Sequence, residues 1–131
     1  MDNENSSRTR VLVVDDEPKI LKFVSLSLNA LGFDVLVASN GEEALRISAA
    51  DSLDLMILDV FMPGLDGFGV LERLREREKD DSSIHLPVIV FSARSSVAEQ
   101  ALSLGASDFI LKPFLPEELA EKIKATVRQS P

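Results

Sequence analysis

The chain has 131 residues, 45% of them hydrophobic and 27% charged, a balance typical of one globular domain with its own core. A formal net charge of −8 disfavours direct binding to nucleic acid or anionic lipid, because both depend on Lys and Arg side chains. The absence of cysteine excludes disulfides and thiolate metal sites, and no apolar run approaches the roughly 20 residues of a membrane-spanning helix.

The N-terminal end of the chain is polar and contains no apolar core of a signal peptide. We therefore expect a cytoplasmic protein that does not associate with membranes. Residues 1–9 are expected to form a flexible tail, and residues 10–129 to form a single domain.

Five short apolar runs predict five β-strands, since each is bounded by charged or turn-forming residues. In chain order they cover residues 11–14, 33–37, 53–58, 88–91 and 108–111. The second run is interrupted by Asp34, which favours a position at the edge of a sheet.

An amphipathic stretch follows each run and predicts a helix. Pro18 and Pro116 suit a first helical turn, and Gly32 and Gly105 suit a C-terminal stop. The predicted core-facing positions are Ile20, Val24, Leu28 and Leu31; Ala44, Leu45, Ser48 and Ala49; Phe68, Leu71 and Leu74; Val97, Ala98, Ala101 and Leu102; and Leu119, Ile123 and Val127.

Five strands that alternate with five helices predict a doubly wound α/β fold, (βα)5 with a five-stranded parallel sheet. Parallel neighbours cannot be joined by tight hairpins, so the connecting helices must cross over the two faces of the sheet. Ligands of such sheets bind beyond the carboxyl ends of the strands.

Polar residues follow four of the five predicted strands at that end. Asp15 and Asp16 follow the first strand, Asp59 the third, Ser92 the fourth and Lys112 the fifth. Because the carboxyl ends of parallel strands share one rim, these side chains are predicted to converge.

The residue types in this group favour phosphoryl transfer with a metal ion. Three carboxylates repel one another unless a proton or cation lies among them, and oxygen ligands without His or Cys favour Mg²⁺ over zinc. An aspartate can attack a phosphoryl group to give an acyl phosphate. Asp59 is the predicted nucleophile, with Lys112 and the Ser92 hydroxyl as stabilisers of the transferred charge.

Each residue also has a structural interpretation. Asp15 could cap the helix that begins near Pro18, Asp59 and Asp66 could be turn residues, and Lys112 could be a solvated charge. Their convergence on one rim favours the functional interpretation.

Four segments resemble the receiver domain of bacterial response regulators, the CheY-like phospho-accepting half of two-component signalling. They read V-L-V-V-D-D-E-P, L-D-V-F-M-P-G-L-D-G, V-F-S-A and F-I-L-K-P-F, and they come in the order of the family. The resemblance extends over about residues 11–127. It implies a flavodoxin-like sheet with the strand order 2-1-3-4-5.

The resemblance also implies the role of each site residue. Asp59 would be the phospho-acceptor, and Ser92 and Lys112 would contact its phosphoryl group. Mg²⁺ would be held by Asp15, Asp16, Asp59 and the backbone carbonyl of Phe61. Phe109 would be an aromatic switch that follows Ser92, and the Lys112–Pro113 bond is expected to be cis. Bulky Phe61 and Arg94 would flank the path of attacking water, and Phe61 is expected to slow hydrolysis of the acyl phosphate.

The leading interpretation is a signalling switch that catalyses only its own phosphorylation and dephosphorylation. The expected phosphodonor is a histidine kinase or a histidine phosphotransfer protein. Phosphorylation would alter the face formed by the fourth helix, fifth strand and fifth helix, which would act on a downstream protein or a fused output domain. The chain would be a monomer or a phosphorylation-dependent dimer.

Two other functions fit the predicted fold less well. A Mg²⁺-dependent hydrolase with an aspartyl phosphate would need a substrate cap, for which the sequence offers no segment. A flavin-binding electron carrier would need a phosphate-cradling loop after the first strand, where Asp15 and Asp16 would repel the anion.

Overall fold

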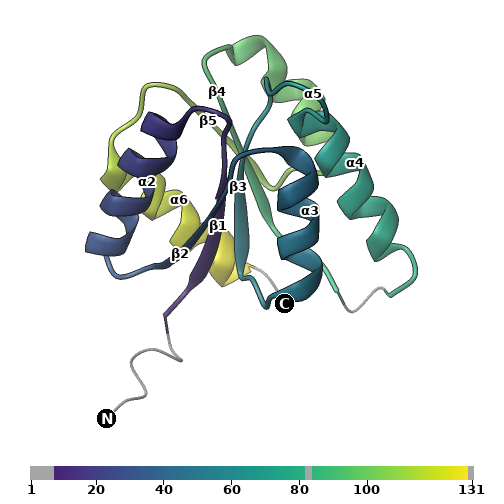
Figure 1. The fold of residues 1–131 in the computed structure, drawn as a ribbon, viewed down its shortest axis with the longest axis horizontal. Coiled ribbons are helices and arrows are strands. Elements are labelled where there is room, and N and C mark those ends of the chain that lie inside the picture. Colours follow the sequence, from purple (N-terminus) through teal and green to yellow (C-terminus); the bar gives the residue numbers. More distant parts are fainter. Residues whose placement is uncertain (1–7, 82–83, 130–131) are drawn as a thin grey trace.

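The five strands form one parallel sheet in the order β2-β1-β3-β4-β5 (Figure 1). The computed structural model describes residues 8–81 and 84–129. Its strands are β1 (Arg10–Val14), β2 (Asp34–Ala38), β3 (Leu55–Asp59), β4 (Val88–Ser92) and β5 (Asp108–Leu111). Its helices are α2 (Pro18–Ala30), α3 (Gly41–Ala50), α4 (Gly67–Glu78), α5 (Ala98–Ser103) and α6 (Pro116–Gln129), and a 3-10 turn, η1 (Ser95–Val97), leads into α5. The predicted flavodoxin-like fold and strand order are confirmed.

The sheet lies between two helical layers. Helices α2 and α6 cover one face, and α3, α4 and α5 cover the other (Figure 1). Along β1, Val11 and Val13 pack toward α2 and α6, whereas Leu12 and Val14 pack toward the opposite layer. The same alternation in β3 and β4 buries these strands on both faces, which explains why their sequences are continuous apolar runs.

Three predicted core positions are exposed to solvent instead. Leu31 is 42% exposed because α2 ends at Ala30 and Leu31 is its C-terminal cap. Leu102 is 48% exposed, because the segment begins as the 3-10 turn η1 and the helical phase changes where α5 starts. Ala49, in the last turn of α3, is exposed, and Ile47 packs against the core from that helix.

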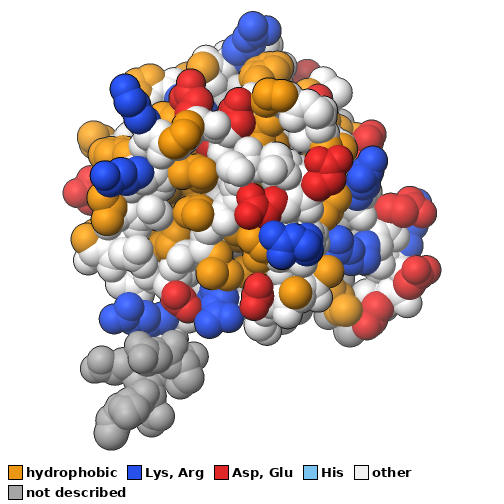
Figure 2. Space-filling model, viewed as in Figure 1, with side chains coloured by type: hydrophobic (Ala, Val, Ile, Leu, Met, Phe, Trp, Pro, Cys, Tyr) orange, Lys and Arg blue, Asp and Glu red, His pale blue; other side chains and the backbone are white. Residues whose placement is uncertain are grey.

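The ends of the chain lie partly outside the described residues. Of the expected flexible tail, residues 1–7 are not described, whereas the carbonyl of Thr9 accepts a 2.9 Å hydrogen bond from the Asp34 backbone N–H, next to β1. Among the described residues, no helix is both long enough and apolar enough to span a membrane. On the face shown in Figure 2, Lys and Arg side chains lie among Asp and Glu side chains.

Candidate functional site

The predicted site residues meet at the carboxyl rim of the sheet. Asp15 and Asp16 follow β1, Asp59 ends β3, Ser92 ends β4, and Lys112 follows β5. These strands are neighbours or near neighbours in the sheet, so residues far apart in the sequence lie together. The backbone N–H of Lys112 donates a 2.8 Å hydrogen bond to the carbonyl of Ser92, which joins the last two strands at this rim.

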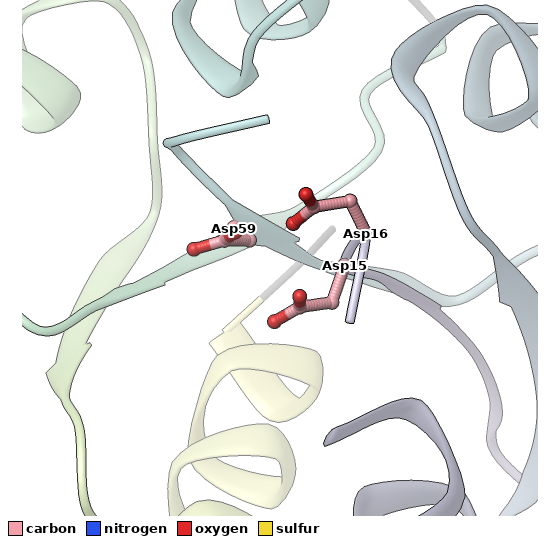
Figure 3. A group of neighbouring side chains, drawn as sticks. All are labelled: Asp15, Asp16 and Asp59. Atoms are coloured by element: carbon pink, nitrogen blue, oxygen red, sulfur yellow. The ribbon is translucent and has the colours of Figure 1, made fainter. Parts of the chain in front are cut away.

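Three carboxylates form the acidic part of the site (Figure 3). One oxygen from each of Asp15, Asp16 and Asp59 lies within 4.8 Å of the others. Asp15 is fully buried and Asp59 is 5% exposed, whereas Asp16 is the most exposed of the three. Three hard oxygen donors at this spacing suit a small divalent cation such as Mg²⁺.

Lys112 brings a positive charge to two of these carboxylates. Its Nζ lies 3.0 Å from Asp15 Oδ2 and 3.3 Å from Asp59 Oδ1. The lysine side chain is 21% exposed, so the pairs are partly shielded from water. One ammonium against three carboxylates leaves the group short of positive charge, which favours a cation in addition to Lys112.

The site raises the pKa of two of its own members. Burial, with a contribution from the Asp15 charge, raises the pKa of Asp59 from 3.8 to about 6, against the opposing attraction of Lys112. Burial alone would lower the pKa of Lys112, but its hydrogen bond to Asp15 and the attraction of Asp59 outweigh burial and raise that pKa above its ordinary value.

Ser92, the last residue of β4, is fully buried at the same rim of the sheet. Its Oγ accepts a 3.2 Å hydrogen bond from the backbone N–H of Arg94, which satisfies the hydroxyl oxygen within its own turn. The hydroxyl hydrogen therefore remains available to an acceptor at the rim.

The turn after β3 is fixed by close backbone packing. The Gly67 N–H donates a 2.8 Å hydrogen bond to the Val60 carbonyl, and a Cβ at Gly67 would collide with the carbonyl oxygen of Asp59. Asp66, for which the sequence allowed the role of a turn residue, is the N-cap of α4 and accepts a 2.9 Å hydrogen bond from the Gly69 N–H. The turn holds Asp59 at the end of its strand.

The interpretation of Asp15 as the cap of α2 is wrong, because that helix has Glu17 as its N-cap residue and no side-chain cap hydrogen bond. The Asp15 Oδ1 accepts a 2.9 Å hydrogen bond from the backbone N–H of Glu17. Its Oδ2 is bound by Lys112. The carboxylate therefore fixes the turn that precedes α2 and belongs to the acidic group.

The site opens into a hollow of about 280 Å³. Phe61 lies at its mouth with 48% of the residue exposed, and the Arg94 guanidinium lies 4.9 Å from the centre of the Phe61 ring. The sequence placed both residues at the approach to Asp59 but did not predict that they stack. The lining residues are Asp15, Asp16, Glu17, Ile20, Asp59, Phe61, Ala93 and Lys112.

Two further features lie along β4 and β5. Phe109 is partly buried and packs against the apolar cluster between the sheet and α3, α4 and α5, and the Lys112–Pro113 bond is cis, as expected. Phe91, predicted only as part of a strand, lies with its ring 4.5 Å from Lys112 Nζ. Its position directly before Ser92 was the only signal in the sequence that it adjoins the site.

The family model described as "Response regulator receiver domain" matches residues 11–124. The chain belongs to this family. As a receiver domain it is a component of two-component signalling, and its Asp15, Asp16 and Asp59 pocket fits phosphorylation and Mg²⁺ binding.

Curated relatives of this receiver domain are transcriptional regulators. It is 42% identical over 128 residues to "Probable transcriptional regulator ycf27" of Cyanidium caldarium, covering 96% of this chain and 49% of that protein. It is 37% identical over 123 residues to the alkaline phosphatase synthesis transcriptional regulatory protein PhoP of Bacillus subtilis, covering 92% of this chain and 49% of that protein. The chain thus spans about half the length of these relatives.

Solved receiver domains share the fold closely. The receiver domain of the Francisella response regulator 1452 is 32% identical, with a TM-score of 0.84 over 93% of this chain and 98% of that one. The response regulator TrrA of Thermotoga maritima, solved in complex with Mg²⁺-BeF, is 36% identical, with a TM-score of 0.80 over 90% of this chain and 98% of that one.

Proposed function

We propose that residues 10–129 form one receiver domain whose Asp59 accepts a phosphoryl group in a Mg²⁺-dependent two-component phosphorelay. The observation that carries this proposal is the position of the Asp59 carboxylate. It lies at the rim of the sheet, 3.3 Å from the Lys112 ammonium and among the carboxylates of Asp15 and Asp16. An acidic nucleophile with a cation and metal ligands already in place suits phosphoryl transfer.

The donor set fits Mg²⁺. Asp15, Asp16 and Asp59 supply carboxylate oxygens that lie within 4.8 Å of one another, and we assign the backbone carbonyl of Phe61 as a further ligand. When bound, the ion would neutralise charge on the phosphoryl oxygens and on the crowded carboxylates. The domain has no His or Cys among these residues that would favour a softer metal.

The chemical step is carried by Asp59. One of its carboxylate oxygens attacks phosphorus, the bond from phosphorus to the donor's histidine nitrogen breaks, and an acyl phosphate forms on Asp59. Lys112 exchanges its contact with the carboxylate for a contact with a phosphoryl oxygen. The Ser92 hydroxyl donates to a second phosphoryl oxygen.

Phosphorylation of Asp59 would change the structure first at the carboxyl ends of β4 and β5. Drawing Ser92 toward a phosphoryl group would shift the turn at the start of η1, because the Ser92 Oγ accepts a 3.2 Å hydrogen bond from the Arg94 N–H there. This turn leads directly into α5, and Phe109 on β5 packs against the same apolar cluster, so we assign Phe109 as the side chain that follows the movement. The face formed by α5, β5 and α6 would thereby change its packing.

We infer partners from this chemistry and from the relatives. The phosphodonor is a histidine kinase or a histidine phosphotransfer protein. The output is a downstream protein or a fused domain, since the relatives are transcriptional regulators of about twice this length. We propose that this domain itself does not bind nucleic acid or membranes, that it resides in the cytoplasm, and that it is a monomer or dimerises on phosphorylation. It is a switch that turns over only its own phosphoryl group.

Phosphoryl uptake from a small acyl phosphate tests this function. With Mg²⁺, the wild-type chain should gain the mass of one phosphoryl group, and excess EDTA should prevent the gain. Asp59→Asn should abolish it, whereas the matched control Asp66→Asn, which alters the cap of α4 in the same turn, should retain it. Equal uptake by wild type and Asp59→Asn would refute the assignment.

A further inference from the structure

The ammonium of Lys112 has an aromatic ring on one side. Its Nζ lies 4.5 Å from the centre of the Phe91 ring, while Asp15 and Asp59 accept hydrogen bonds from it at 3.0 and 3.3 Å. A cation over the face of an aromatic ring is attracted by the ring's quadrupole, and more strongly where water is excluded. Phe91 is fully buried, so this contact is shielded from water.

The register of the sheet places the ring at this point. Phe91 is paired with Asp59 on β3 and with Ile110 on β5. Side chains paired across neighbouring parallel strands project from the same face, so the Phe91 ring lies beside the Asp59 carboxylate. Lys112 comes two residues after Ile110, and its side chain therefore reaches back across the Phe91 ring to the acidic group.

We propose that Phe91 is a positioning residue for phosphoryl transfer: its ring holds the Lys112 ammonium where the ammonium can contact a phosphoryl group on Asp59. The inference rests on the proposed function of Asp59 and Lys112. Phe91 does not touch the reacting atoms, and it acts through Lys112.

A ring is suited to this task because of the chemistry of lysine. The side chain has a flexible four-carbon stem and a compact ammonium that can turn toward any nearby carboxylate. The contacts with Asp15 and Asp59 must change when the phosphoryl group arrives, whereas the contact with the ring is compatible with both states. The ring thus keeps the ammonium in place while its hydrogen-bond partners are exchanged.

The ring itself is held firmly. Phe91 makes an edge-to-face contact with Phe114, with ring centres 6.0 Å apart, and belongs to the buried cluster under α2 and α6. Close packing leaves few alternative rotamers for a side chain of this size. A leucine at this position would preserve an apolar core but would offer no ring face to the ammonium.

Phe91→Leu tests the inference, with Phe33→Leu as the matched control. Phe33 is 4% exposed in the same apolar cluster but lies before β2, at the opposite rim. Both variants lose a buried ring, so both should lose stability. In the 131-residue chain with Mg²⁺ and a small acyl phosphate, Phe91→Leu should be phosphorylated about three- to tenfold more slowly than Phe33→Leu, as expected for one cation–ring contact.

NMR of Lys112 gives a second measurement that needs no phosphorylation. Because the ammonium lies over a ring face, the ε-methylene protons of Lys112 should resonate upfield of those of exposed lysines. The upfield shift should persist in Phe33→Leu and disappear in Phe91→Leu. A shift that survives in Phe91→Leu would overturn the inference.

If Phe91→Leu does not fold, a second variant tests the inference: a chain in which trifluorophenylalanine replaces Phe91 and no other phenylalanine. Fluorination keeps the shape of the ring nearly unchanged but weakens the negative face that attracts the cation. Phosphorylation of this chain should be slower than that of the wild type, and an unchanged rate would overturn the inference. If the wild type takes up no phosphoryl group, both the proposed function and the role of Phe91 are overturned. If the wild type is phosphorylated but Phe91→Leu and Phe33→Leu take up the phosphoryl group at equal rates, only the role of Phe91 is overturned.

Discussion

The position of Asp59 is unfavourable for a charged carboxylate. It is 5% exposed, faces Asp15 and Asp16, and has Lys112 as its cationic partner among the described residues. In the absence of a metal ion, ionisation of Asp59 therefore destabilises the folded state. A cation or a phosphoryl group with its counter-charges relieves this conflict.

The pH dependence of stability follows from the raised pKa of Asp59. Because this pKa is about 6 in the folded chain and 3.8 ordinarily, the folded state binds more protons between those values, and the contribution of Asp59 to the free energy of unfolding falls as pH rises through this window. Asp59→Asn does not titrate, so without metal it should be more stable than the wild type by about 2 kcal/mol above the window.

Urea unfolding in EDTA at several pH values measures this difference. We expect the advantage of Asp59→Asn to grow between about pH 4 and pH 6 and to level off above. A difference that stays constant across this range would show that Asp59 is not destabilised by its charge.

Gly67 is required by the backbone next to Asp59. A Cβ there would collide with the carbonyl oxygen of Asp59, so Gly67→Ala should lower the free energy of unfolding by about 2 kcal/mol or more and should displace the acceptor. Gly69→Ala is the control, because its nearest contact is the end of the flexible Leu65 side chain. Urea unfolding measures the stability of the two variants. Equal stabilities would show that a Cβ at position 67 does not collide with the Asp59 carbonyl.

At the scale of elements, a partly buried ion pair between Arg75 and Glu78 holds α4 against the chain at the amino-terminal ends of β4 and β5. The Arg75 guanidinium donates to the Gly105 carbonyl at 2.8 and 3.1 Å, to the Leu86 carbonyl at 2.9 Å, and to Glu78 at 2.8 Å. Glu78 in turn accepts a 2.9 Å bond from the Leu86 N–H. One side chain thus joins α4 to the segment before β4 and to the turn between α5 and β5.

Removal of this arginine should loosen that connection without harming the chemistry. Arg75→Met removes the guanidinium from Glu78, whose side chain is 10% exposed, together with the hydrogen bonds to the Gly105 and Leu86 carbonyls, and should cost about 3 kcal/mol of stability. Arg77→Met, which among the described residues loses exposed hydrogen bonds to Ser48 and Leu45, should cost less than about 1 kcal/mol. Phosphorylation at saturating Mg²⁺ should be unchanged in both, and an equal loss of stability would contradict the role of Arg75.

Local patterns predicted which elements form. The continuous apolar runs of β1, β3 and β4 are a property of strands buried on both faces, so the sequence itself carries that information. The outward turn of Leu102 was missed because a 3-10 turn shifts the helical phase by an amount that periodicity does not encode.

The rim site was predictable for a related reason: strand order and direction bring Asp15, Asp59 and Lys112 to one edge whatever the details of packing. Contacts that depend on side-chain rotamers were not predictable from the sequence. The stacking of Arg94 on Phe61 and of Lys112 on Phe91 depends on register and on side-chain direction, neither of which a single sequence specifies.

For the whole molecule, binding of Mg²⁺ should raise stability. A ligand that binds only the folded state at about 100 times its Kd adds about 2.7 kcal/mol. Thermal unfolding of the wild type should therefore shift upward with MgCl₂ beyond the effect of NaCl at equal ionic strength, and Asp16→Ala should reduce the shift. The same response to both salts would show that the three carboxylates bind no specific cation.

Chemical reduction identifies directly the residue that carries the phosphoryl group, which we propose is Asp59. Borohydride reduces an aspartyl phosphate to homoserine, so reduction of the phosphorylated chain followed by peptide mapping marks the acceptor. We predict homoserine at position 59 alone, formed only when Mg²⁺ and the phosphodonor are both present. Homoserine at another aspartate, or phosphate that resists borohydride on a serine or threonine, would contradict the claim.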